Sequence, residues 1–318
     1  MKVFRLIQKG GRPGGGQRIR AIPIARRVAA RFAGKAAKFG SENEALRGCG
    51  DANSISGLWA DRRPAASRAA TAIAIVFLTC ASPLFAADIT SNLLAHWKLD
   101  DSGMSADDSS GNGITGMLTN GPTWTTGRIG GALSTDGTND FVDCGSAVGP
   151  ASAFSCALWA RPYTVASGRQ MYAQATFNVQ AYCQFFVNTD GVVHARIFDG
   201  GVSTWIGRTT PTGTLAVATW SHLCFTWDGG TTNSAIKIHK NGVRVDSADD
   251  GSGTFTAANT NSITRRIGAQ FYLGSPNAVW SGPIDDVRIY SRALSAADIH
   301  ALYIQGGPAA QYYLQHQQ

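Results

Sequence analysis

The chain has 318 residues, of which 44% are hydrophobic and 15% are charged, and its formal net charge at pH 7 is +7. This charge is unevenly distributed: residues 1–87 carry 15 Lys/Arg and 4 Asp/Glu, a net +11, whereas residues 88–318 carry 13 and 17, a net −4. The larger part of the chain is therefore mildly acidic. Because it lacks a stripe of Arg and Lys interleaved with aromatic residues, we expect no nucleic-acid partner.

The first 61 residues form a basic segment rich in Gly and Arg, and its weak apolar periodicity predicts a disordered leader. Residues 62–87 are typical of a secretory signal peptide, with an Arg-rich start, the apolar run from Ala69 to Cys80 and small residues up to Ala87. We expect cleavage after Ala86 or Ala87. The product would be secreted, periplasmic or held at the cell surface.

The signal-like segment begins about 60 residues into the chain, which leaves two other interpretations open. In one, the true start lies near Leu58 and the preceding residues are an artefact of start-site assignment. In the other, residues 69–87 are not cleaved and anchor the chain in a membrane. The apolar run is shorter than the roughly 20 residues of a helical span and is followed by Pro83, which favours cleavage.

If the chain is exported, the cysteines outside the leader can form disulfides, because the compartments outside the cytoplasm are oxidising. These candidate disulfide cysteines are Cys144, Cys156, Cys183 and Cys224. Four cysteines permit three full pairings, and the sequence does not choose among them. Cys156 and Cys224 lie within apolar strand patterns, where a free cysteine behaves as a small hydrophobic residue. Disulfide formation and simple core packing both stay open, whereas the spacing of Cys and His is unlike that of a zinc site.

From Asn92 to Tyr303 the chain is a succession of short segments rich in β-branched and aromatic residues, separated by Gly-containing turns. The clearest turn signal is Asn241-Gly242 between two alternating runs, which predicts a two-residue hairpin. The predicted strands are 93–99, 154–161, 171–177, 183–188, 192–198, 222–227, 235–240, 243–246 and 284–290. This pattern favours one all-β domain, a two-sheet antiparallel sandwich of the jelly-roll type.

One short helix is predicted after the last strand. Ser295 is placed to act as its N-cap and Asp298 as the acid of a capping box, while Leu294 and Ile299 have the spacing of a hydrophobic staple. The tail at 304–318 is rich in Gln and Ala, and we expect it to be disordered.

Several motifs along residues 92–303 occur together in a characteristic order. They are Leu94-Ala-His-Trp-Lys-Leu-Asp100, Asp108-Ser-Ser-Gly-Asn-Gly113, Gly127-Arg-Ile-Gly-Gly-Ala-Leu133, Asp136-Gly-Thr-Asn-Asp-Phe-Val142, Trp220-Ser-His222 and Ile284-Asp-Asp-Val-Arg-Ile-Tyr290. In this order the chain resembles the LamG-like jellyroll domains of the concanavalin A-like lectin/glucanase superfamily. The resemblance implies two sheets packed face to face with the terminal strands adjacent, and we assign residues 88–303 to one such domain.

Domains of the superfamily that the chain resembles often carry a structural calcium, and the resemblance implies Ca²⁺ here, where the terminal strands meet. The candidate ligands are Asp100, Asp108, Asn112, Asp285 and Asp286. Carboxylate and amide oxygens suit a hard cation of this kind. The alternative is structural: Asp108 and Asn112 form an Asx-type turn, and Asp285 or Asp286 accepts hydrogen bonds from a loop.

The same superfamily contains glycoside hydrolases and polysaccharide lyases, so the resemblance by itself is compatible with an enzyme. Its β-glucanases carry the pattern Glu-x-Asp-x-x-Glu, but residues 88–318 contain no Glu. Retaining hydrolysis needs two carboxyl groups about 5 to 5.5 Å apart. The histidines are scattered, and no Gly-x-Ser-x-Gly motif is present. We therefore predict no catalytic residues and no enzymatic activity.

Binding is the class of function that these residues favour. Carbohydrate sites on β-sandwiches use exposed aromatic rings that stack on sugars, together with a few polar side chains. The candidates near strand or loop ends are Tyr172, Tyr182, Trp205, Tyr272 and Trp280. Two alternatives stay open: most tryptophans pack the core, or the module recognises a cell-surface protein in place of a polysaccharide or glycan.

Overall fold

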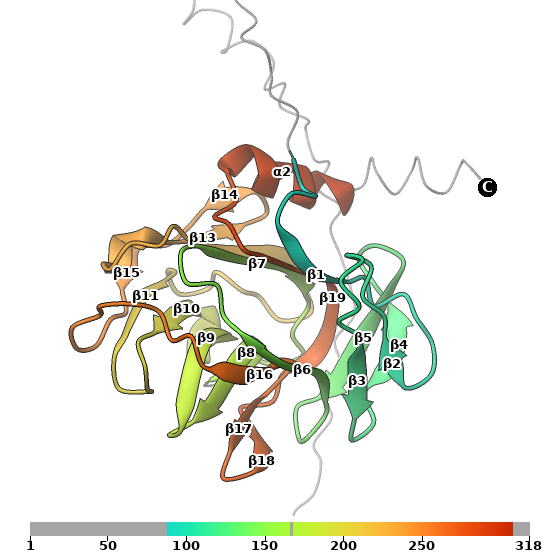
Figure 1. The fold of residues 1–318 in the computed structure, drawn as a ribbon. Helices are drawn as coiled ribbons and strands as arrows, with labels where there is room; N and C mark the ends of the chain where they lie inside the picture. The colour runs from blue at the N-terminus through green and yellow to red at the C-terminus, as the bar shows by residue number, and fades with distance from the viewer. Residues whose placement is uncertain (1–87, 166–167, 308–318) are drawn as a thin grey trace, which may run out of the picture. The chain divides into compact units, whose positions relative to one another are not determined.

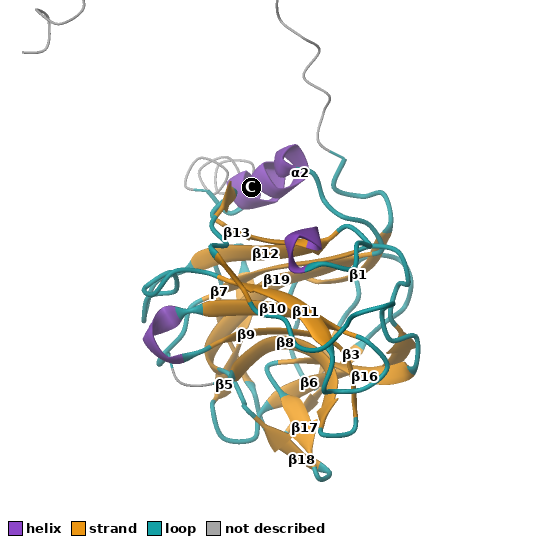
Figure 2. Cartoon of the chain, turned by 90° about the vertical axis from the view of Figure 1, so that its left-hand side faces the viewer, coloured by secondary structure: helices purple, strands orange, loops and turns teal. Residues whose placement is uncertain are grey.

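The computed structural model describes residues 88–165 and 168–307. The predicted leader, the signal-like segment and residues 308–318 lie outside this part of the chain. The described residues form two β-sheets packed face to face, and their one α-helix covers the outer face of the smaller sheet (Figure 1, Figure 2). This arrangement confirms the predicted all-β sandwich with one helix near its C-terminal end.

The smaller sheet has eight strands in the order β14-β13-β12-β7-β19-β5-β4, and β1 also pairs with β19. Its strands are β1 (Leu93–Trp97), β4 (Thr123–Thr126), β5 (Gly131–Asp136), β7 (Phe154–Ala160), β12 (Ser221–Trp227), β13 (Ile236–Lys240), β14 (Val243–Arg244) and β19 (Ser281–Tyr290). Along one edge β19 pairs with β5 up to Ile284 and with β1 from Val287 onward. The exchange of partners therefore falls at Asp285 and Asp286.

The larger sheet has eleven strands in the order β15-β11-β10-β9-β8-β16-β6-β3-β2, with β17 and β18 joined to it through β8. They are β2 (Ser105–Ala106), β3 (Gly116–Thr119), β6 (Phe141–Val148), β8 (Arg169–Phe177), β9 (Gln180–Val187), β10 (Val193–Phe198), β11 (Trp205–Thr209), β15 (Ala248–Asp249), β16 (Ser262–Ile267), β17 (Gln270–Tyr272) and β18 (Ser275–Asn277). Two 3₁₀ turns, η1 (Thr189–Gly191) and η2 (Asn233–Ala235), interrupt the connections.

All nine predicted strands are present, with shifted ends. The strands that were not predicted include the four-residue Thr123–Thr126 and strands interrupted by Gly, Ser or Asp, such as Gly131–Asp136 and Phe141–Val148. Gly and Asp have weak strand preference, and pairing with neighbouring strands determines the conformation of such segments. The predicted Asn241-Gly242 hairpin joins β13 and β14, with both residues at positive φ (50° and 80°).

The main core lies between the two sheets and contains alternate residues of the central strands. In β7, Phe154, Cys156 and Leu158 face the larger sheet, while Ala157 faces the opposite side and packs under the helix. All seven residues of β7 are buried because both faces of the strand are covered.

The structure corrects the suggestion of disulfides. The thiols of Cys144, Cys156, Cys183 and Cys224 are free and buried, and burial raises the pKa of each. These cysteines act as small apolar residues of the core, which was the other interpretation of the sequence.

The helix α2 (Ala296–Gln305) begins as predicted. The Ser295 hydroxyl accepts from the backbone N–H of Asp298, and the Asp298 carboxylate accepts from the backbone N–H of Ser295. Leu294 and Ile299 belong to one buried cluster with Tyr290, so the expected staple is present. The helix ends at Gln305, two residues beyond the predicted domain boundary, which corrects the start of the predicted tail.

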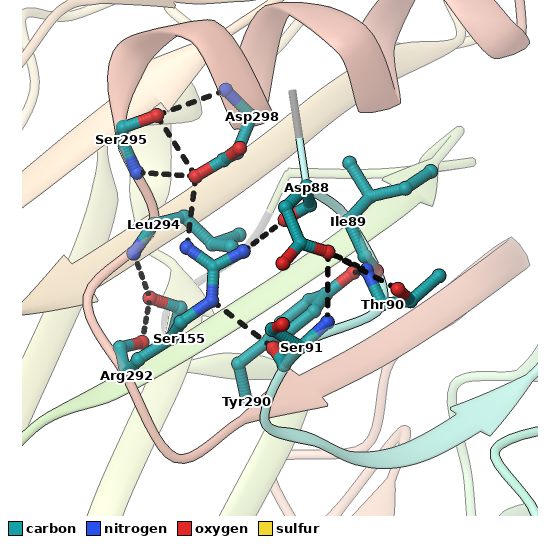
Figure 3. A network of polar contacts seen from close by, with 10 residues as sticks. All are labelled: Asp88, Ile89, Thr90, Ser91, Ser155, Tyr290, Arg292, Leu294, Ser295 and Asp298. Atoms are coloured by element: carbon teal, nitrogen blue, oxygen red, sulfur yellow. Dashed lines mark hydrogen bonds and ion pairs between the residues drawn. The ribbon is translucent and has the colours of Figure 1, made fainter. Parts of the chain in front are cut away.

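Arg292 joins the first described residues to the corner before α2 (Figure 3). Its Nε donates to the Ser91 carbonyl at 3.0 Å, its Nη1 donates to the Asp298 carboxylate at 2.8 Å, and its Nη2 donates to the Asp88 carbonyl. The Arg292 carbonyl in turn accepts from the Ser155 hydroxyl of β7 at 2.7 Å. One guanidinium therefore fixes the N-terminal segment, the helix start and the sheet in one place.

Replacing Arg292 with Lys should lower the free energy of unfolding by about 1–2 kcal/mol, because a single ammonium cannot reach all three acceptors. Urea denaturation measures this change. The exposed Lys98, replaced by Arg, is the matched control and should leave stability unchanged. An Arg292→Lys midpoint equal to that of the wild type would show that the corner is not held by this guanidinium.

Candidate functional site

Two polar regions of the fold are candidates for a functional site. The first is the terminal seam, which we define as β1, the loop 108–114 and β19. The second is the outer face of the larger sheet.

Asp108 anchors the seam loop to β1. Its Oδ1 accepts from the backbone N–H groups of His96 and Ser110, both at 2.9 Å, and its Oδ2 accepts from the Ile114 N–H at 2.9 Å and the Ser110 hydroxyl at 2.8 Å. Burial raises the pKa of this carboxyl, but these donors outweigh burial and hold the pKa below its usual range. Both oxygens of Asp108 are thus engaged in a turn.

Asn112 closes the same loop against β1. Its amide nitrogen donates to the carbonyls of Leu93 and Leu94, each at 3.0 Å. The structural alternative, an Asx-type turn of Asp108 and Asn112, therefore holds for Asp108, whose Oδ1 accepts from the Ser110 N–H, whereas Asn112 bonds to β1 instead.

Asp286 is a buried ion-pair partner within the seam. Its Oδ1 lies 2.7 Å from Nε2 of His96 and 3.1 Å from Nη2 of Arg288. Burial by itself raises the pKa of Asp286, but the His96 hydrogen bond and the Arg288 charge together hold it below its usual range. Since Arg288 also donates to Oε1 of Gln305 at 2.9 Å, the pair ties β19 to α2.

Asp285 precedes Asp286 in β19, but its pKa is shifted in the opposite direction. Its Oδ2 accepts from the backbone N–H groups of Arg128 and Ile129 at 2.7 and 2.8 Å, while its buried Oδ1 has no hydrogen-bond partner among the described residues. Burial raises the pKa of Asp285 to about 8, and the negative charges of Asp286 and Asp100 add to the effect. The two backbone hydrogen bonds offset only part of it.

The five residues proposed as calcium ligands do not share a site. Two of them are bonded to the backbone of β1, one is paired with Arg288, and the other two, Asp285 and Asp100, accept from different N–H groups of the loop 128–131. Residues 88–165 and 168–307 contain no group of three or more His, Cys, Asp or Glu side chains arranged to hold a metal ion. The residues present therefore do not fit the expected calcium site, because N–H and guanidinium donors occupy most of their oxygens.

The second region centres on a side-chain pair on the outer face of the larger sheet. In β10, Ala195 and Ile197 belong to the core between the sheets, so His194 and Arg196 lie on the opposite face. Both side chains form hydrogen bonds with the Asp250 carboxylate. Its Oδ2 is 2.8 Å from Nε of Arg196 and 2.8 Å from Nδ1 of His194, and its Oδ1 is 2.9 Å from Nη2 of Arg196.

Two aromatic rings flank this ion pair. The guanidinium carbon of Arg196 lies 5.0 Å from the ring centroid of Phe186 and 4.8 Å from that of Trp205. The Phe186 ring also stacks on His194, with centroids 4.6 Å apart. We call Phe186, His194, Arg196, Trp205 and Asp250 the outer-face cluster.

The glycine at position 207 makes this cluster possible. Gly207 pairs with Arg196 across β10 and β11, and its carbonyl accepts from the Asp250 N–H at 2.9 Å. A Cβ atom at Gly207 would lie 2.4 Å from the Asp250 carbonyl oxygen and 3.0 Å from Cγ of Arg196. Because Gly207 has no side chain, Asp250 and Arg196 can approach each other without a steric clash.

Asp250 stays ionised within the cluster. Burial raises its pKa, but the hydrogen bonds from His194 and Arg196 and the Arg196 charge lower it to about 2. Arg196 donates hydrogen bonds to this carboxylate from Nε and Nη2. Its Nη1 makes no hydrogen bond to the described part of the chain. With 22% of the Arg196 side chain exposed, the cluster offers a fixed donor beside the half-buried ring of Trp205, while Phe186, which is only 5% exposed, supports the guanidinium from within the protein.

The structure divides the five aromatic candidates. Tyr172, Tyr182 and Trp280 are 0% exposed, so the prediction that they stack on a ligand is wrong. The β8–β9 pair contains two register irregularities, one beside Tyr172 and one that leaves Tyr182 unpaired, and both rings lie in the core. Trp205 and Tyr272 are half-buried, Trp205 within the outer-face cluster and Tyr272 on β17.

Sequence reasoning missed four members of the cluster: Phe186, His194, Arg196 and Asp250. The alternation of His194 and Arg196 with core residues was a usable signal for polar side chains on one face of β10. The pairing of Arg196 with Asp250 spans 54 residues and was not encoded in any local pattern.

Comparisons with known proteins agree with this fold. A family model described as the concanavalin A-like lectin/glucanases superfamily matches residues 136–300. No curated protein gave a significant match.

No helix within the described ranges 88–165 and 168–307 is long and apolar enough to span a bilayer.

Two similar solved structures share the fold at low identity. One is domain 4 of AbnA, a GH43 extracellular arabinanase from Geobacillus stearothermophilus, in complex with arabinotriose: the identity is 22%, the TM-score is 0.51, and the match covers 67% of this chain and 98% of that one. The other is the binding domain of Paraclostridial Mosquitocidal Protein 1, at 14% identity and a TM-score of 0.51, covering 68% of this chain and 52% of that one. The chain thus spans about half of the second structure.

Because the pKa of Asp285 is raised, we expect the free energy of unfolding to fall as the pH rises from about 4 to about 8. Between its usual pKa of 3.8 and the raised value, the folded state keeps a proton that the unfolded state has lost, so raising the pH favours unfolding. Asp285→Asn should remove this slope and stabilise the protein at pH 8 by on the order of 5 kcal/mol, which is about four pKa units at ~1.36 kcal/mol each. Urea denaturation of both proteins from pH 4 to pH 8 gives the difference. Parallel curves would refute the assignment.

Proposed function

This chain belongs to the concanavalin A-like lectin/glucanases superfamily, and we propose that it is an exported, non-catalytic module that binds carbohydrate at the outer-face cluster. The observation that supports this function is the Arg196 guanidinium, held between the rings of Phe186 and Trp205 by the Asp250 carboxylate. Aromatic faces beside fixed polar groups are the usual elements of a site that recognises sugar rings and hydroxyls.

The state of two carboxylates supports the proposal that the module is non-catalytic. Asp250 has a pKa of about 2 and is held by Arg196 and His194, so it has no proton to give near neutral pH. Asp285, whose pKa is raised, is fully buried beneath the sheet surface and cannot reach a polysaccharide. Together with the lack of Glu in residues 88–318, this favours binding without cleavage.

Export is proposed from the signal-like sequence at 62–87. N-terminal sequencing of protein recovered outside the cytoplasm should find a first residue near Asp88. Recovery of the uncleaved chain in the membrane fraction would instead identify residues 69–87 as an anchor.

Binding can be tested with a polysaccharide and glycan array that includes arabinan oligosaccharides, because domain 4 of AbnA was determined with arabinotriose. Arg196→Ala and Trp205→Ala should each lower the affinity for the bound glycan at least tenfold, through the loss of a hydrogen-bond donor or a stacking face. Tyr163→Ala removes an exposed ring outside both sheets and is the matched control.

Three outcomes would overturn the proposal. One is that the intact protein binds no carbohydrate on the array. Another is that Tyr163→Ala weakens binding as much as Trp205→Ala does. The last is release of new reducing ends from the bound polysaccharide, which would show that the module is an enzyme.

A further inference from the structure

Two neighbouring hairpins present apolar side chains to solvent. One is the β8–β9 turn, with Phe177 43% exposed and Val179 64% exposed, and the other is the β17–β18 turn, with Leu273 80% exposed. The hairpins touch: Tyr272 pairs with Phe177 along β17 and β8, and their rings meet edge to face with centroids 5.5 Å apart. We call these four side chains the hairpin tips.

The tips project away from the rest of the fold. In both views the β17–β18 hairpin extends beyond the sheets at the end opposite α2 (Figure 1, Figure 2). Its base is fixed by Phe271, which lies under the Arg266 guanidinium at 3.8 Å and against the Phe141 ring at 5.2 Å. The hairpin is therefore presented on a firmly packed base.

Leu273 does not favour the turn in which it lies. Leu273 and Gly274 have φ values of 49° and 81°, and Asn241 and Gly242 of the β13–β14 hairpin have φ values of 50° and 80°. Asn and Gly suit this left-handed geometry, whereas a leucine there is strained. A strained and exposed leucine contributes little to folding, which indicates that it is kept for a contact outside the fold.

Charge distinguishes the tips from an ordinary protein surface. Residues 177–180 and 270–277 contain no Asp, Glu, Lys or Arg. The exposed polar residues beside the apolar ones, such as Asn178, Ser275 and Asn277, are all uncharged. Apolar and aromatic side chains among uncharged polar groups suit the interface of a lipid bilayer.

We propose that the hairpin tips insert into the surface of a lipid bilayer. A bilayer fits better than a second protein because the tips consist of only four side chains on two hairpins, whereas each partner of a standard protein interface contributes about 20–30 residues. Residues 88–318 carry a net charge of −4, so attraction to anionic lipid does not drive this contact. The tips form a site separate from the outer-face cluster, and neither proposal depends on the other.

The test is flotation of the protein with phosphatidylcholine vesicles. Wild-type protein should float with the vesicles, with little change between 0.1 and 0.5 M salt, the usual range for screening surface charges. Leu273→Asn should lower the partition coefficient at least tenfold while the melting temperature stays equal or rises, because Asn relieves the strained turn. Glycan binding should be unaffected.

The matched control is Val243→Asn, which removes a valine 64% exposed on β14, away from the tips, and should float as the wild type does. The first residue of each preparation is determined by sequencing, so that any lipid binding by residues 1–87 is the same in all variants. Failure of the wild type to float, or equal flotation of Leu273→Asn, would overturn the proposal. A concentration-dependent dimer that Leu273→Asn abolishes would assign the tips to a second copy and would overturn it too.

Discussion

The fold depends on β19, a ten-residue strand that is buried along its whole length and carries two adjacent aspartates at its centre. One of them, Asp286, is ionised against Arg288 and His96, and its φ of 49° accompanies a bulge in the pairing with β7. The other, Asp285, is protonated more easily because burial outweighs its two backbone donors. Two buried carboxylates can be neighbours here because only one of them is held as an anion. With them in place, β19 exchanges β5 for β1 and brings the two ends of the domain together.

The binding proposal rests on a different part of the same architecture. The larger sheet uses one face for the core, and strand alternation sends His194 and Arg196 to the other. Asp250, which directly follows the edge strand β15, pairs with Arg196 over Gly207, and this ion pair holds the guanidinium beside two aromatic rings. The sheet thereby gives a rigid support to side chains that would cost entropy to order if they lay on loops. In this proposal the recognition site and the core lie on opposite faces of the same strands.

The sequence predicted the architecture better than the site. Strand alternation, the Asn241-Gly242 turn and the capping box at Ser295 are local patterns, and each was read correctly because local energetics decide them. The calcium ligands and Tyr182 were misjudged because burial depends on pairing partners and on bulges. One register irregularity places Tyr182 in the core, although simple alternation would send it outward. The contact between Arg196 and Asp250 joins distant segments, so only the folded chain reveals it.

The most direct test of the account is to observe the outer-face cluster while a glycan binds. In ¹⁵N-resolved NMR spectra, titration with a polysaccharide fragment should move the indole N–H signal of Trp205 and the guanidinium Nε–H signal of Arg196. The indole signals of the buried Trp97 and Trp227 should stay in place. Saturable shifts confined to the cluster are the result that carbohydrate binding on this face predicts. Shifts that leave Trp205 and Arg196 unchanged while other residues respond would place the site elsewhere and contradict the account.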